Sequence, residues 1–152
     1  MRKKLIRTLI FPYWRLRRGM TLGVQALILR NGDEVLMVRH GYRPGWHFPG
    51  GGVEWRETLV EALLREVDEE TGVVIKSEPR LFGMYANFVT APSDHVAFFL
   101  ADEWEQPRIP EPSYEIREQR FFPLGDLPED ISPGAQRRLR EVFESAPPSP
   151  HW

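Results

Sequence analysis

The most regular pattern of apolar and polar residues in the chain lies in residues 59–71 and has the period of a helix. Apolar residues recur there at spacings of three and four, which places them on one stripe: Val60, Leu63, Leu64 and Val67. Thr58 and Glu61 match a capping box ahead of this stripe, and Gly72 follows it at a position where helices often end. The pattern therefore predicts one helix with both ends specified.

Shorter apolar or alternating runs on either side of this helix predict strands. They cover residues 20–30, 34–39, 73–75, 81–89, 95–100 and 115–122. The Asn-Gly pair at 31–32 predicts a hairpin turn, and residues 104–113, rich in proline and charge, predict a loop. The Ser-Pro pair at 132–133 begins a second helix that extends to about Phe143. Strands around one helix, with a second helix at the end, predict a single domain of the α/β or α+β class.

The predicted helix carries three glutamates, Glu66, Glu69 and Glu70, on a face beside its apolar stripe. Each like-charged pair costs roughly 0.2–0.5 kcal/mol in an isolated helix, and no lysine or arginine on that face is close enough in sequence to neutralise all three. A solvated acidic face is the simplest interpretation. The proline-glycine turn at 49–52 changes it, because glycines let the backbone approach a ligand closely. Clustered carboxylates are hard oxygen ligands suited to Mg²⁺ or Mn²⁺.

The same helix also completes a longer motif. Five residues separate a glycine from a glutamate, and seven more separate that glutamate from the run Arg-Glu-apolar-x-Glu-Glu-x-Gly, in which x is any residue. This motif resembles the signature box of the Nudix hydrolase family, with every defining position filled: Gly51, Glu57, Arg65, Glu66, Val67, Glu69, Glu70, Gly72 and Val73. The resemblance implies an α/β/α sandwich around a mixed β-sheet, in a Nudix hydrolase domain that we place at residues 19–145.

The resemblance also implies the chemistry, which is hydrolysis of a diphosphate bond in a nucleoside diphosphate linked to another group. Water activated by Mg²⁺ or Mn²⁺ is the implied nucleophile. The metal ligands implied are Glu66, Glu69, Glu70 and the backbone carbonyl of Gly50. The structural positions implied are Gly51, Glu57 and Gly72. Arg65 is grouped with Glu69 as catalytic, and we expect it to act by pairing with Glu57 and bracing the box.

A further glutamate beyond the box often binds metal or acts as the base in this family. Glu115 follows the proline-rich loop and precedes an alternating strand, so it stands at the corresponding place as a metal ligand and catalytic residue. Glu118 is the rival. In a regular strand the two side chains point to opposite faces, so we expect them not to be interchangeable.

Candidate substrate contacts lie just before the glycine turn: Arg39, Tyr42, Trp46 and Phe48. The aromatic residues could stack on a base, and the alternative is that they belong to the rim and the core. Markers that many ADP-ribose hydrolases and some dinucleoside polyphosphate hydrolases carry beyond the box are absent; position 87, for example, is asparagine rather than proline. The substrate is therefore open within the class of nucleoside diphosphate derivatives.

Composition excludes several other classes of protein. The chain has no cysteine, which rules out disulfides, thiolate zinc sites and cysteine nucleophiles. Its net charge of −2 argues against a stable nucleic-acid complex, and no apolar run approaches the length of a membrane span. These features fit a cytoplasmic hydrolase that acts on a small molecule.

The two ends of the chain differ from the rest. Residues 1–18 hold seven basic residues and no acid, which leaves the remainder with 13 basic and 22 acidic residues, a net of −9. We expect this basic arm or helix to dock on the acidic domain or on a second subunit of a homodimer. The alternative is an adaptor that contacts anionic lipid or RNA through the arm. Residues 146–152, rich in proline, predict a disordered tail. A Nudix-fold module that senses nucleotides without catalysis is the other alternative.

Overall fold

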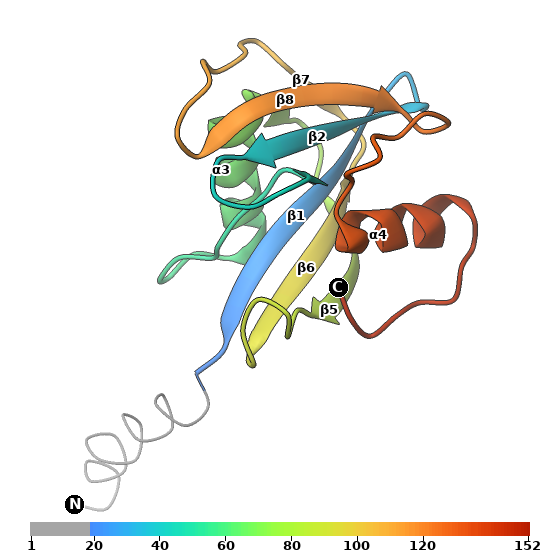
Figure 1. Ribbon diagram of the computed structural model, residues 1–152. Helices are drawn as coiled ribbons and strands as arrows, with labels where there is room; N and C mark the ends of the chain where they lie inside the picture. The colour runs from blue at the N-terminus through green and yellow to red at the C-terminus, as the bar shows by residue number, and fades with distance from the viewer. Residues whose placement is uncertain (1–18) are drawn as a thin grey trace, which may run out of the picture.

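A computed structural model describes residues 19–152 of the chain (Figure 1). The predicted basic arm, residues 1–18, lies outside the described residues. The elements are β1 (Thr21–Arg30), β2 (Glu34–His40), β3 (Trp46–His47), α3 (Leu59–Thr71), β4 (Val74–Ile75), β5 (Arg80–Ala86), β6 (Asp94–Ala101), β7 (Trp104–Glu105), β8 (Ile116–Pro123) and α4 (Pro133–Phe143). In this part of the chain, no helix has both the length and the apolarity that crossing a membrane would require.

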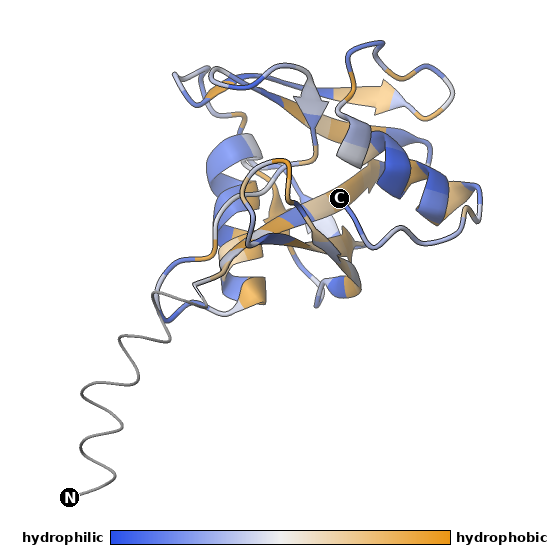
Figure 2. Cartoon of the chain, turned by 60° about the horizontal axis from the view of Figure 1, so that its bottom comes forward, coloured by the Kyte–Doolittle hydropathy of each residue, from blue (hydrophilic) through white to orange (hydrophobic). Residues whose placement is uncertain are grey.

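The main sheet is mixed and has a helix on each face. Its strand order is β3-β2-β1-β6-β5, with β8 also paired to β2, and β1 is parallel to β6. One core cluster joins the sheet to α3, and a second joins it to α4, so the two helices cover opposite faces (Figure 1). Hydrophobic residues concentrate in the strands, and hydrophilic residues cover the outward sides of the helices (Figure 2). The predicted α/β/α sandwich around a mixed sheet is confirmed.

The strands of the first hairpin separate soon after their turn, and this opening positions the glycine turn. β1 and β2 pair only next to the turn, where Leu29 faces Val35, and β2 then pairs along its length with β8. Residues 49–53 run beside β1 instead, held by three backbone hydrogen bonds of 2.9–3.0 Å. The turn is therefore fixed to the central sheet.

Helix α3 begins and ends where its sequence predicts. The capping box at Thr58 is present, and Gly72 adopts the left-handed conformation with φ of 72°. The apolar stripe is displaced from the predicted one, because Leu64 is 38% exposed and the buried side is formed by Ala62, Leu63 and Val67. A small alanine on this side lets the helix axis approach the sheet more closely than a leucine would allow.

Two strand predictions need correction. β5 ends at Ala86 rather than at residue 89, because Asn87 starts a turn in which its carbonyl accepts from the Thr90 N–H at 3.0 Å. Part of the stretch predicted to be a loop forms the short strand β7, which pairs with β4. The first difference comes from a local turn, and the second from a pairing partner distant in sequence.

Residues 146–152 were predicted to be a disordered tail, and in the structure they fold back onto the domain. The carbonyl of Pro150 accepts from the Ala86 N–H, and the Trp152 N–H donates to the Ala86 carbonyl, both at 2.9 Å. The indole of Trp152 packs against the ring of Phe98, with ring centres 5.6 Å apart. The prediction counted the prolines and missed the tryptophan, whose buried apolar area offsets the entropy lost on ordering the segment.

Candidate active site

The glycine turn and helix α3 meet at two glutamates. The Gly50 N–H donates to Oε2 of Glu70 at 2.8 Å. Gly50 has φ of 143°, and a Cβ at this position would collide with the Val24 carbonyl. A Cβ on Gly51 would likewise collide with the carboxylate of Glu66. Glycine is therefore required at position 50, and at position 51 it lets the backbone lie directly on the Glu66 carboxylate.

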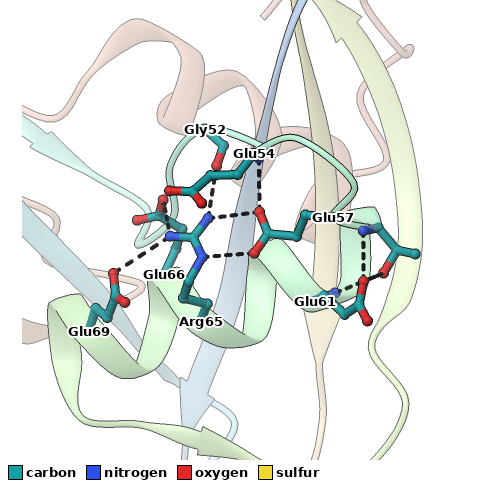
Figure 3. A network of polar contacts seen from close by, with 8 residues as sticks. Gly52, Glu54, Glu57, Glu61, Arg65, Glu66 and Glu69 are labelled. Atoms are coloured by element: carbon teal, nitrogen blue, oxygen red, sulfur yellow. Dashed lines mark hydrogen bonds and ion pairs between the residues drawn. The ribbon is translucent and has the colours of Figure 1, made fainter.

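Arg65 connects the turn, the loop after it and the helix (Figure 3). Its guanidinium donates to both carboxylate oxygens of Glu57, at 2.8 and 2.9 Å, and to Oε1 of Glu66 at 2.8 Å. It also donates to the Gly52 carbonyl at 3.1 Å and lies 3.6 Å from Glu69. Hydrogen bonds from Arg65 and from the Glu54 backbone lower the pKa of Glu57 to about 2. This pairing matches the bracing role that the family resemblance implies.

The three box glutamates lie in different environments. Glu69 is exposed, with 62% of its side chain accessible, whereas Glu70 is buried and has only 6% accessible. Burial raises the pKa of Glu70 to about 8; the Gly50 N–H opposes this rise, and the charges of Glu66 and Glu115 add to it. Burial also raises the pKa of Glu66. The arrangement therefore holds more negative charge than its own protein partners offset.

A cavity of about 380 Å³ lies between α3 and the loop that leads into β8. Its lining residues are Glu66, Glu69, Glu70, Ile109, Pro110, Glu111, Pro112, Ser113, Glu115, Ile116, Arg117, Glu118 and Gln119. All three box glutamates and both candidates for the distal glutamate thus border one space. Its volume is within the range of small-molecule sites.

The two distal candidates differ in what surrounds them. Glu115 is exposed just before β8, and its charge raises the pKa of both Glu66 and Glu70. Glu118 pairs with Arg120 at 2.6 Å. The pairing of β2 with β8 shifts register between these two glutamates, which interrupts the regular alternation that the sequence argument assumed.

Two of the four predicted substrate contacts are core residues. Trp46 is 3% exposed and Phe48 is fully buried, and both belong to the cluster that packs against α4. Their rings contact Phe122 and Phe98, which leaves no face for a nucleotide base. These two predictions are therefore wrong, because β3 directs the segment into the core opposite α3.

The other two candidates are accessible. Tyr42 is 60% exposed, and the charges of Glu70, Glu115 and Glu66 add to the rise in its pKa that burial causes. It therefore lies beside the acidic cluster. Arg39 pairs with Asp130 at 2.8 Å, and its guanidinium lies over the Trp46 ring, 4.7 Å from the ring centre.

Sequence reasoning missed His40 and Arg43. Nδ1 of His40 lies 3.9 Å from Oε1 of Glu70, and its Nε2 lies 2.6 Å from a terminal nitrogen of Arg43. Burial and the charge of Arg43 lower the pKa of His40 to about 3. One signal could have found them: residues 35–53 contain two arginines and two histidines but no acid, directly ahead of the acidic helix.

The chain matches the family described as NUDIX domain over residues 20–143. It belongs to the Nudix family.

The curated relatives of this Nudix chain match it over part of their length. An 8-oxo-dGDP phosphatase of Mus musculus is 43% identical over 68 residues, which are 43% of this chain and 21% of the relative. An RNA pyrophosphohydrolase of Stenotrophomonas maltophilia is 41% identical over 56 residues, 37% of this chain and 27% of the relative. The matched segments thus cover less than a third of either relative.

Solved Nudix structures match most of the chain. A MutT NUDIX hydrolase of Burkholderia pseudomallei has a TM-score of 0.71 at 25% identity and covers 82% of this chain and 99% of its own. A MutT protein of Methanosarcina mazei has a TM-score of 0.63 at 27% identity, with coverage of 84% and 95%. The fold described here is that of Nudix hydrolases.

The Nudix box glutamates also allow a test of whether a metal would fit. Within residues 19–152, no group of three or more His, Asp or Glu side chains is already arranged around one metal position. The carboxylates of Glu66 and Glu69 turn toward Arg65 instead. The carboxylates of Glu66, Glu70 and Glu115 nevertheless suit a divalent cation, because they offer hard oxygen atoms. Their negative charges repel one another, and a bound cation would offset this repulsion. These residues fit a divalent cation.

Proposed function

We propose that this Nudix protein hydrolyses a diphosphate bond in a nucleoside diphosphate derivative and requires a divalent metal ion. The observation that carries the proposal is the cavity where the glutamates of α3 and Glu115 border one space. A buried carboxylate with a strongly raised pKa and no ion pair to an arginine or lysine is costly unless a cation offsets its charge. A polyphosphate with its metal supplies both the cation and the ligand that such a cavity accommodates.

Each residue of the candidate site has a distinct part in this proposal. Glu66, Glu69, Glu70 and Glu115, with the Gly50 carbonyl, are the groups that would hold metal. Arg65 keeps Glu66 and the glycine turn in place through its bonds to Glu57 and Gly52. Glu115 borders the cavity, and its part in this proposal is to accept a proton from attacking water. Tyr42 is exposed beside the cluster and is the candidate for contact with the base.

Nudix hydrolases generally use divalent metal ions. When bound, Mg²⁺ or Mn²⁺ would lower the pKa of water and offset negative charge on the phosphates.

A module that senses nucleotides without catalysis is the second reading. The intact glutamate set and its brace favour the enzyme, because binding alone does not need a buried carboxylate beside three others. The adaptor hypothesis depends on residues 1–18 and, like the homodimer, stays a prediction.

The test is a panel of substrates offered to the purified protein with Mg²⁺ or Mn²⁺. The panel holds 8-oxo-dGDP, ADP-ribose, a UDP-linked sugar and triphosphorylated RNA, the chemistries that the names of similar proteins suggest. We expect at least one of them to be cleaved at its diphosphate bond, measured by chromatography of the phosphorylated products, and we expect cleavage to stop when a chelator is added. Full turnover in excess chelator would refute the metal requirement.

Glu69→Gln is the matched variant for this assay. Glu69 is exposed, so its substitution should leave the fold intact. We expect kcat to fall by about 10²–10⁴, the scale for loss of a catalytic electrostatic or proton-transfer group. Turnover at the wild-type rate would mean that the acidic face is only solvated.

A further inference from the structure

Arg43 has surroundings that no other cation of the described chain shares. Within residues 19–152, the other arginines and the lysine either have a carboxylate within 4.0 Å or are exposed to water. Arg43 is partly buried and has no carboxylate at that distance. Its Nε is buried without a hydrogen-bond partner. A desolvated guanidinium with unused donors is unfavourable unless an anion completes it.

The contact between Arg43 and His40 fixes how the guanidinium is held. A guanidinium nitrogen can only donate, so Nε2 of His40, 2.6 Å away, must be the acceptor. The proton of the neutral ring is then on Nδ1, which lies 3.9 Å from Oε1 of Glu70. A single imidazole ring therefore separates Arg43 from the buried carboxylate of the proposed metal site. One terminal nitrogen is used in this contact, and within residues 19–152 the buried Nε has no hydrogen-bond partner.

We propose that Arg43 is a substrate-binding residue whose guanidinium binds a phosphate group of the diphosphate substrate. The inference rests on the proposed function, because it places the phosphate next to the glutamates that would hold metal. The planar fork of arginine donors matches the oxygens of a phosphate, which a single ammonium group does not. His40 holds the guanidinium of Arg43 in position. Its neutral ring has no negative charge to balance the charge of the guanidinium.

Arg65 does not compete for this role. Its donors are already taken by Glu57, Glu66 and the Gly52 carbonyl. Arg117, at the opposite wall of the cavity, is exposed and lies over the ring of Tyr114. Among the described residues, Arg43 is thus the cation near Glu70 that keeps one buried donor, Nε, without a partner and one terminal nitrogen that His40 does not use.

The experiment measures binding of imidodiphosphate, a diphosphate whose nitrogen bridge resists hydrolysis, in the presence of Mg²⁺. Calorimetry compares the wild type with Arg43→Gln, which removes the charge and keeps an N–H donor for His40. Arg140→Gln is the matched control, because Arg140 is exposed on α4 at the other face of the sheet. We expect Arg43→Gln to weaken binding about 10- to 100-fold, the range for loss of a charge-assisted hydrogen bond, and Arg140→Gln to have no effect.

Two further readouts separate substrate binding from a structural role. Mn²⁺ affinity without the diphosphate, followed by electron paramagnetic resonance, should change less than about twofold, because Arg43 is not a ligand. With a hydrolysed substrate, KM should rise more than kcat falls, and Arg43→Lys should restore part of the affinity. If Arg43→Gln unfolds, Arg43→Met gives the same comparison.

Wild-type affinity in both charge-removing variants would overturn the inference, and so would an equal loss in Arg140→Gln or a wild type that binds no imidodiphosphate. If imidodiphosphate binding depends on Arg43 but no nucleotide is hydrolysed, the proposed hydrolysis fails and the phosphate contact stands.

Discussion

A carboxylate that loses contact with water is costly to keep charged, and Glu70 is in that position. Among residues 19–152 its one hydrogen-bond donor is the Gly50 N–H, which compensates only part of the cost. The neighbouring charges of Glu66 and Glu115 make the cost larger. The cation proposed for this cavity would offset a cost that the free protein carries.

At the level of single residues, Glu115 and Glu118 make the sharpest comparison. We expect Glu115→Gln to lower kcat at least about tenfold, because a metal ligand or general base is lost, with little change in Tm. Glu118→Gln should be nearly neutral for rate, since Glu118 is engaged with Arg120. Steady-state kinetics of both variants on one substrate decide the matter. The reverse ranking would assign the role to Glu118, and no effect from either would move the base elsewhere.

At the level of elements, α3 is fastened at three places. Its N-terminus is closed by the capping box, its C-terminus by Gly72, and its middle is tied to the glycine turn through Arg65. This rigidity keeps Glu66 and Glu70 at fixed distances from the backbone of the turn. A precise site on a helix needs such supporting contacts, because small displacements are costly in rate.

The ion pair between Glu57 and Arg65 should contribute less to stability in acid. Hydrogen bonds lower the pKa of Glu57 from its ordinary value of 4.5 to about 2, so its charge stabilises the fold above pH 4.5 and this contribution is lost as the pH falls toward 2. We expect Glu57→Gln to lower Tm at pH 7, and the gap to the wild type to shrink between pH 5 and 2. Thermal unfolding across this range measures it. A gap that does not change with pH would contradict the ion-pair explanation. Glu144→Gln, at the exposed residue that follows α4, is the control.

At the level of the whole molecule, the sheet separates two cores with different tasks. The core on the α3 side supports the candidate site, and the core on the α4 side receives Trp46, Phe48 and the returning tail. A buried pair of Arg138 and Glu141, 2.6 Å apart, lies beneath that tail. Stability and chemistry are thus assigned mainly to opposite faces.

This separation predicts a variant that affects stability alone. Trp152→Ala removes an aromatic ring packed against Phe98 and Tyr85, and we expect it to cost about 3 kcal/mol, the low end for a large aromatic residue because Trp152 is partly exposed. Tm should fall by about 6–12 °C for a domain of this size. Val89→Ala, at a fully exposed position, should change stability by less than about 0.5 kcal/mol. Loss of kcat in folded Trp152→Ala would contradict the separation.

The sequence predicted what depends on neighbouring residues and failed where distant partners decide. The capping box, Gly72 and the pairing of Glu57 with Arg65 involve residues within one short stretch, and all are present. The burial of Trp46 and Phe48 depends on which face of the sheet their segment reaches, and α4 from far along the chain determines that face. The ordering of Trp152 likewise needs Phe98, more than fifty residues earlier.

The two walls of the cavity differ in how freely they tolerate mutation. One wall is α3, whose every turn is committed to packing, capping or the glutamate cluster. The other includes residues 109–113, a surface loop that belongs to neither core cluster. Surface loops accept changes in length and composition that packed helices do not. Mutation in this loop can therefore alter which molecules enter the cavity while the chemistry stays constant, which makes residues 109–113 the natural region for a library that seeks new substrates.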